Sequence, residues 1–180
     1  MAAALRAILV EQPRPTYRLW RAQGKRSANE GPMTSLTLVR GIKARQQVVF
    51  DAVTTAEGIA QWWGPDAGPV LVAEADPRVG GFYRLRFRTL RGTEHESSGE
   101  FLEIDAPRRV VLSWRWKGGL EDPGESRIEI TLRATPDGTD LSFTQSQLHD
   151  EASSRSHEQG WAGSLRKLEA YLAKGEALQS

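Results

Sequence analysis

The spacing of the apolar residues changes near residue 150, and this change constrains the fold more than any other feature of the chain. Upstream of it, apolar and polar residues alternate; in segment 82–90, for example, arginines separate the apolar residues. Downstream, apolar residues recur every three or four positions, at Trp161, Leu165, Leu168 and Leu172. Alternation predicts strands with one apolar face, whereas the later spacing predicts a long helix with one apolar stripe.

Seven segments are predicted to be strands: 35–44, 70–75, 82–90, 93–104, 109–116, 127–133 and 140–147. Asp137-Gly138, between the last two segments, is a hairpin signal. Two short helices are predicted between the first two strands. The first covers 45–53, and the second is capped by Thr54 or Thr55 and ends at Trp63, before Gly64-Pro65. The long helix is predicted over 150–174.

This order of elements predicts an α+β fold, in which a curved antiparallel sheet of six to seven strands wraps around the C-terminal helix. With 180 residues the chain is long enough for one domain with its own core. A strongly bent sheet that holds a single helix leaves a cavity wherever the inward side chains do not fill the space between them.

Cysteine is absent, which excludes disulfides and thiolate zinc sites and favours a reducing compartment. The apolar run 2–10 is interrupted by Arg6 and is too short to span a bilayer. Glu11, Gln12 and Pro13 stand where a signal peptide would carry its small-residue cleavage site. We therefore expect a cytoplasmic protein without a membrane partner.

Residues 1–32 carry six arginines and lysines against two glutamates, a net charge of +4. A basic arm of this kind can bind nucleic acid or another anionic surface. The segment lacks periodicity and repeated basic clusters, so a disordered leader is the preferred interpretation and no nucleic-acid partner is expected. Translation from Met33 is an alternative that makes 1–32 an artefact of the assigned start. The expected organisation is a leader 1–32, a domain 33–174 and a tail 175–180.

Six ordered segments carry a family resemblance. They are the first-strand segment ending near Ala44, VVFDAVTTAEGIAQWWGP (48–65), PRVGGFYRL (77–85), GEFLEIDAPRRVVLSW (99–114), DGTDLSFTQS (137–146) and HEQGWAGSLRKLEAYL (157–172). In this order they resemble the bacterial branch of the START/SRPBCC superfamily, within it the domain similar to the activator of the heat-shock-protein-90 ATPase. The resemblance implies a helix-grip fold with a cavity between sheet and C-terminal helix. Its members include lipid carriers, hormone receptors, cyclase-like proteins and co-chaperone domains, and it brings no shared catalytic residues.

Ten residues are predicted to line such a cavity: Trp62, Trp63, Tyr83, Phe87, Trp114, Trp116, Phe143, His157, Trp161 and Leu165. Large aromatic side chains provide apolar contact area at low entropic cost and suit a flat ligand. The alternative for each of them is a place in the packed core.

No metal, cofactor or catalytic site is predicted. His149 and His157 stand eight residues apart, not three or four, and Ser164 lies outside any nucleophile motif. Glu100 and Glu103 are expected on opposite faces of one strand, which argues against an acid pair. Glu103 is interpreted either as a buried carboxylate or as the ion-pair partner of Arg108 or Arg109.

Three hypotheses for function follow. The first is a non-enzymatic domain that binds a small hydrophobic or amphipathic ligand. The second, implied by the resemblance, is a chaperone-interacting module of the stress response. The third is a cyclase- or hydrolase-like enzyme in which Glu103, His95 or Gln145 transfers protons; a protein that is not an enzyme is preferred. The arginines of the outer sheet face (Arg84, Arg86, Arg88, Arg127 and Arg133) are interpreted as solvated, with an acidic protein partner as the alternative. No oligomeric state is predicted.

Overall fold

The computed structural model describes residues 34–117 and 124–177. The predicted leader, the alternative start at Met33 and the end of the predicted tail lie outside the described residues.

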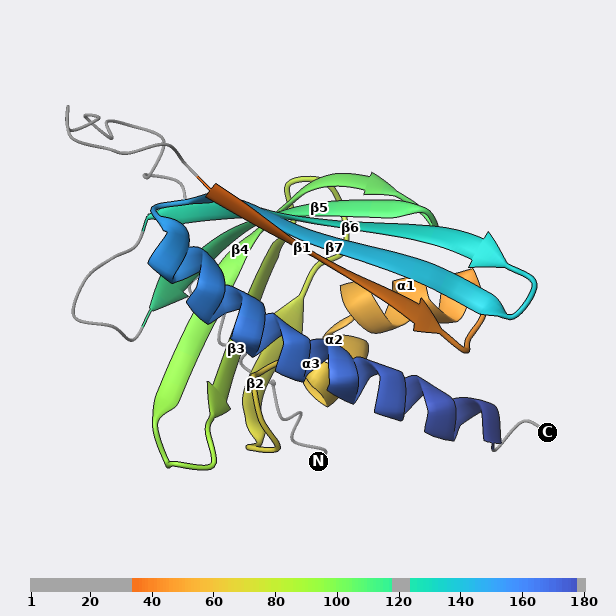
Figure 1. Ribbon diagram of the computed structural model, residues 1–180, viewed down its shortest axis with the longest axis horizontal. Helices are drawn as coiled ribbons and strands as arrows, with labels where there is room; N and C mark the ends of the chain where they lie inside the picture. The colour runs from red at the N-terminus through yellow and green to blue at the C-terminus, as the bar shows by residue number, and fades with distance from the viewer. Residues whose placement is uncertain (1–33, 118–123, 178–180) are drawn as a thin grey trace, which may run out of the picture. The chain divides into compact units, whose positions relative to one another are not determined.

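The described residues form one seven-stranded antiparallel sheet and three helices (Figure 1). The elements are β1 (Thr34–Ile42), α1 (Gln46–Thr54), α2 (Ala56–Trp62), β2 (Val70–Ala75), β3 (Phe82–Arg88), β4 (Glu94–Asp105), β5 (Arg109–Lys117), β6 (Glu125–Thr135), β7 (Gly138–Leu148) and α3 (Glu151–Ala177). The strand order is β1-β7-β6-β5-β4-β3-β2. The sheet curves around α3, which runs across its concave face (Figure 1). The predicted α+β, helix-grip architecture is confirmed.

Alternation along the strands builds the core, as the sequence predicts. In β3 the side chains of Tyr83, Leu85 and Phe87 are buried, whereas the arginines between them face outward and are half-buried or exposed. In β7, Leu141, Phe143 and Gln145 are likewise buried. Most of the buried apolar side chains of the strands thus lie on the face that receives α3.

The two short helices pack closely against each other. Thr55 is the N-cap of α2, and its hydroxyl accepts a hydrogen bond from the Gly58 N–H at 3.1 Å. Thr54, the other predicted cap, instead donates back to the Phe50 carbonyl. The indole N–H of Trp62 donates to the Ala52 carbonyl at 2.9 Å, so α2 is joined to α1 through a buried hydrogen bond.

Helix α3 begins after Asp150, whose carboxylate accepts from the Ser153 N–H at 2.7 Å. The predicted stripe is confirmed, because Trp161, Leu165, Leu168 and Leu172 are all buried. The helix continues to Ala177, three residues beyond the predicted end.

The prediction for Glu103 is wrong in one respect. The register of β4 against β5 shifts between Phe101 and Glu103, and this bulge places Glu103 opposite Val111 on the outer face. There its carboxylate, about half exposed, accepts from Arg109 and Arg127. Glu100 and Glu103 therefore share the outer face, the buried-carboxylate alternative is wrong, and the predicted ion pair with Arg109 is confirmed.

Candidate ligand-binding cavity

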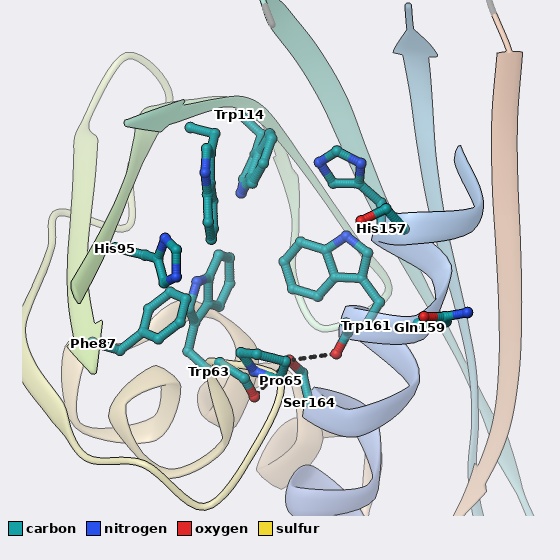
Figure 2. A pocket seen from close by; sticks show the side chains of 13 residues that line it. Trp63, Pro65, Phe87, His95, Trp114, His157, Gln159, Trp161 and Ser164 are labelled. Carbon is teal, nitrogen blue, oxygen red and sulfur yellow. Dashed lines mark hydrogen bonds between the residues drawn. The ribbon is translucent and has the colours of Figure 1, made fainter. Parts of the chain in front are cut away.

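A cavity of about 470 Å³ lies between the N-terminal half of α3 and the inner face of β3–β5, and it is open to solvent (Figure 2). Three structural units supply its walls. The segment after α2 contributes Trp63, Gly64 and Pro65; the strands contribute Phe87, His95, Trp114 and Trp116; helix α3 contributes Ser156, His157, Gln159, Gly160, Trp161 and Ser164.

The space is empty because the first part of α3 has small or polar side chains that do not fill it. Residues 151–160, with the sequence EASSRSHEQG, include no buried residue and no large apolar side chain. Trp161 is the first buried residue of the helix. Protein interiors normally pack without voids, so a helix that presents serine and glycine to a sheet leaves the opposite side chains without partners. The hollow is thus a property of the helix sequence.

The aromatic rings of the walls contact one another and hold each other in place. Trp114 and Trp116 are stacked, with ring centroids 5.6 Å apart and planes inclined by 28°. Trp63 meets Trp161 edge-on at 5.0 Å. The imidazole of His95 lies 4.8 Å from the ring of Trp116, and the ring of Phe87 is also in contact with it at 5.6 Å. Such contacts favour a preformed wall with little conformational entropy left to lose.

Buried hydrogen bonds fix two of these indoles. Trp63 donates from Nε1 to the Ser97 hydroxyl at 3.0 Å. Trp161 donates from Nε1 to Oε1 of Gln145 at 2.6 Å, and Gln145 in turn donates from Nε2 to the Ser126 hydroxyl at 2.8 Å. Because each polar group is satisfied, the network stabilises one orientation of the Trp161 ring.

The floor of the cavity, formed by Gly64 and Pro65, is joined to α3 by hydrogen bonds and by a close backbone approach. Ser164 donates to the Gly64 carbonyl at 3.0 Å (Figure 2), and the Lys167 ammonium donates to the carbonyls of Trp63 and Asp66 at 2.7 and 2.8 Å. Burial lowers the pKa of Lys167. A Cβ atom on Gly163 would lie only 2.1 Å from the Pro65 carbonyl oxygen, so glycine is required for this close approach.

Two ring nitrogens at the cavity have no hydrogen-bond partner among the described residues. They are Nε1 of Trp114 and Nδ1 of His95, and both are buried. The third polar ring, His157, stands edge-on to Trp114 at 5.1 Å, and its Nδ1 lies 2.7 Å from the Ser153 carbonyl oxygen. Unpaired buried polar atoms are rare in folded proteins and cost about 1–3 kcal/mol each.

The groups of the enzyme hypothesis are not brought together at the cavity. The lining contains no aspartate, glutamate, lysine or arginine. The three groups of the enzyme hypothesis are kept apart: Glu103 is on the outer face, Gln145 is engaged by Trp161 and Ser126, and only His95 reaches the cavity. Within residues 34–117 and 124–177, no group of three potential ligands is placed to hold a metal ion.

Six of the ten predicted residues line the cavity: Trp63, Phe87, Trp114, Trp116, His157 and Trp161. The other four, Trp62, Tyr83, Phe143 and Leu165, lie in the core outside it and are at most 1% exposed. Tyr83, for instance, donates its hydroxyl to the Ser113 carbonyl at 2.8 Å, and burial raises the pKa of that hydroxyl. Contact of any of the ten with a ligand stays a prediction.

The sequence reasoning missed His95 as a lining residue. The strand pattern indicates this position, because His95 lies opposite the inward-facing Phe87 in the pairing of β3 with β4. It also stands two residues before the buried Ser97, on the same face of the strand. The small lining residues of α3, such as Gly160, carried no comparable signal.

None of the helices in the described part of the chain has the length and apolar character needed to cross a membrane.

Comparison with known proteins agrees with this architecture. The solved structures that resemble it include the following three. A protein of Chromobacterium violaceum is 29% identical, with a TM-score of 0.70, and the match covers 77% of this chain and 96% of that one. The AHSA1 protein of Silicibacter pomeroyi is 28% identical with a TM-score of 0.71, covering 79% and 99%. A protein of Rhizobium leguminosarum is 25% identical with a TM-score of 0.70, covering 79% and 96%.

A search of curated proteins returned no match. The model of one protein family, described as activator of Hsp90 ATPase homolog 1-like protein, matches residues 43–173. The match includes both short helices, six of the seven strands and α3 through Ala173, and it spans well over half of the 180 residues. The chain therefore belongs to the family of activator of Hsp90 ATPase homolog 1-like proteins.

Proposed function

We propose that the domain binds a small, flat, apolar or amphipathic molecule in the cavity under α3. The observation that carries this proposal is an open cavity of about 470 Å³ with four tryptophans in its walls. Pockets that hold small molecules in proteins measure roughly 300–1,000 Å³ and combine mainly apolar walls with a few polar groups. The lining fits this description in both respects.

The affinity would come from apolar burial. Each 100 Å² of apolar surface removed from water contributes about 2.5 kcal/mol. The indoles are already held by ring contacts and by the hydrogen bonds of Trp63 and Trp161, so little of this free energy is spent on ordering the walls.

Titration with Nile red, an uncharged flat dye, tests the proposal. We expect enhanced and blue-shifted dye emission with the wild-type protein. A Gly160→Phe variant should weaken dye binding at least tenfold, because Gly160 lines the cavity and a Cβ there would meet only the Pro65 Cβ, at 4.0 Å. Gly175→Phe is the matched control: this glycine lies in the same helix with nothing within 4 Å of its Cβ position and is not part of the lining. Equal dye binding by the wild type and Gly160→Phe, both folded by circular dichroism, contradicts the proposal.

The family description favours a second candidate, contact with an Hsp90-type chaperone. Addition of the full chain to a purified Hsp90 should then raise the rate of ATP hydrolysis. An unchanged rate together with no co-elution in gel filtration removes this candidate and leaves the first one intact.

A further inference from the structure

We infer that the cavity selects an uncharged ligand that carries a hydrogen-bond acceptor at the β4 end and a donor at the α3 end, held between His95 and His157. This inference rests on the proposed ligand-binding function and adds the chemical class of the ligand.

The first step concerns charge. No carboxylate, ammonium or guanidinium group lines the cavity. The nearby ammonium of Lys167 is directed to the carbonyls of Trp63 and Asp66. A charged ligand would lose its hydration without gaining a counter-ion, which costs several kcal/mol. For a cation, the attraction of the indole faces offsets part of this cost, whereas an anion has no such compensation. The walls therefore disfavour carboxylates and phosphates most strongly.

The second step concerns His157. Its Nδ1 lies 2.7 Å from the Ser153 carbonyl oxygen. A carbonyl oxygen can only accept, so the proton of the neutral ring is on Nδ1. The other ring nitrogen, Nε2, then carries a lone pair. His157 thus offers the cavity an acceptor, and a ligand hydroxyl or N–H group is its complement.

The third step concerns His95, which offers the cavity a donor where His157 offers an acceptor. Its Nδ1 is buried without a partner. A proton there would be a buried donor with no acceptor among the described residues, which carries the full desolvation cost of the N–H group. The proton is therefore on Nε2, the nitrogen left to meet the cavity. His95 offers a donor, and a ligand carbonyl is its complement.

The two histidines lie on opposite sides of the cavity. Figure 2 shows His95 on the strand side and His157 on α3, with the rings of Trp63, Trp114 and Trp161 between them. The two imidazoles thus stand on either side of a largely aromatic cavity, whose lining also includes Ser156, Gln159 and Ser164. A flat molecule with a carbonyl at one end and a hydroxyl at the other satisfies both ends at once.

Five naphthalenes of similar size test this inference by calorimetric titration: naphthalene, 2-naphthol, 2-acetylnaphthalene, 6-hydroxy-2-acetylnaphthalene and the anion 6-hydroxy-2-naphthoate. We expect the hydroxy-ketone to bind at least tenfold more tightly than naphthalene, because it gains one hydrogen bond at each histidine. The anion should bind at least tenfold more weakly than the hydroxy-ketone.

Variants separate the two ends. His95→Phe should weaken 2-acetylnaphthalene and leave 2-naphthol unchanged, whereas His157→Phe should do the opposite. His149→Phe is the control, because His149 is exposed and outside the lining. Binding of naphthalene or of the anion as tight as that of the hydroxy-ketone overturns the inference and leaves the proposed function standing. Binding of none of the five compounds overturns both.

Discussion

The two halves of α3 meet the same sheet in different ways. In the C-terminal half, Leu165, Leu168 and Leu172 are buried and fill the space above the strands. In the N-terminal half, residues 151–160 bury nothing, and the space below them is the cavity. Trp161 marks the boundary and is held by Gln145. The backbone of a helix on a curved sheet therefore does not determine whether the space between helix and sheet is filled. The side chains of the helix determine whether that volume becomes core or cavity.

The largest effect is expected at the filled half. Leu168→Ala removes a fully buried side chain and should lower the free energy of unfolding by about 2–5 kcal/mol, because the surroundings cannot collapse into the void. Urea unfolding measures the loss. Tyr171→Ala, on the more exposed side of the same helix, should change it by only about 0.5 kcal/mol. Similar losses for the two variants would erase the distinction between the packed stripe and the rest of the helix.

Two glycines of α3 test where the helix changes from lining the cavity to packing closely against its surroundings. Gly163→Ala brings a Cβ to 2.1 Å from the Pro65 carbonyl oxygen and forces the cavity floor away from α3, at a cost of about 1–3 kcal/mol. Gly160→Ala meets nothing closer than the Pro65 Cβ at 4.0 Å, so alanine's helix propensity should stabilise the protein by up to about 1 kcal/mol. Thermal melting of the two variants should shift in opposite directions. An unchanged or raised melting temperature for Gly163→Ala would show that the close contact at Gly163 is unimportant.

Two tryptophans of the cavity are expected to differ in how much the loss of their indole N–H group lowers the stability of the protein. Trp161→Phe leaves Oε1 of the buried Gln145 without its donor, whereas Trp114→Phe removes a nitrogen that has no partner among the described residues. Trp161→Phe should therefore be more destabilising by about 1 kcal/mol, as one lost hydrogen bond costs. Denaturant midpoints compare them directly, and a larger loss for Trp114→Phe would contradict the assignment.

The smallest effect concerns the start of the helix above the cavity. The Ser153 backbone N–H lowers the pKa of the Asp150 carboxyl that caps α3. Since the folded-state pKa lies below that of the unfolded chain, about 3.9, this stabilisation is complete above that pH and is lost as pH falls through the folded-state pKa. The protection of the amides of residues 153–160, that is, the intrinsic exchange rate at the same pH divided by the observed rate, should fall in this acid range. Asp150→Asn, which keeps a side-chain acceptor, should remove that pH dependence; an unchanged profile would exclude Asp150 as its source.

The sequence predicted the fold well because two periodicities carry it. Alternation in β3 and β7 and the stripe from Trp161 to Leu172 are local patterns, and each sets a face without reference to the rest of the chain. The same reasoning was wrong for Glu103, because a β-bulge places its side chain on the outer face and alternation does not predict bulges.

The cavity was only partly predictable, for a different reason. Trp114 and Phe143 occupy inward positions on neighbouring parts of the sheet, yet one lines the cavity and the other lies in the core. The difference depends on what α3 places opposite each of them. Alternation reports the direction of a side chain, whereas packing against a distant helix decides whether it meets protein or empty space.

The pairing of β1 has a consequence for how the chain folds during synthesis. β1 starts the sheet in sequence, but its only strand neighbour in the described sheet is β7, with Thr34 opposite Leu148. At roughly 5–20 residues per second, the ribosome needs many seconds to deliver that neighbour. Contacts so remote along the chain slow folding. The first strand must therefore wait, unpaired, until almost the whole domain has been made.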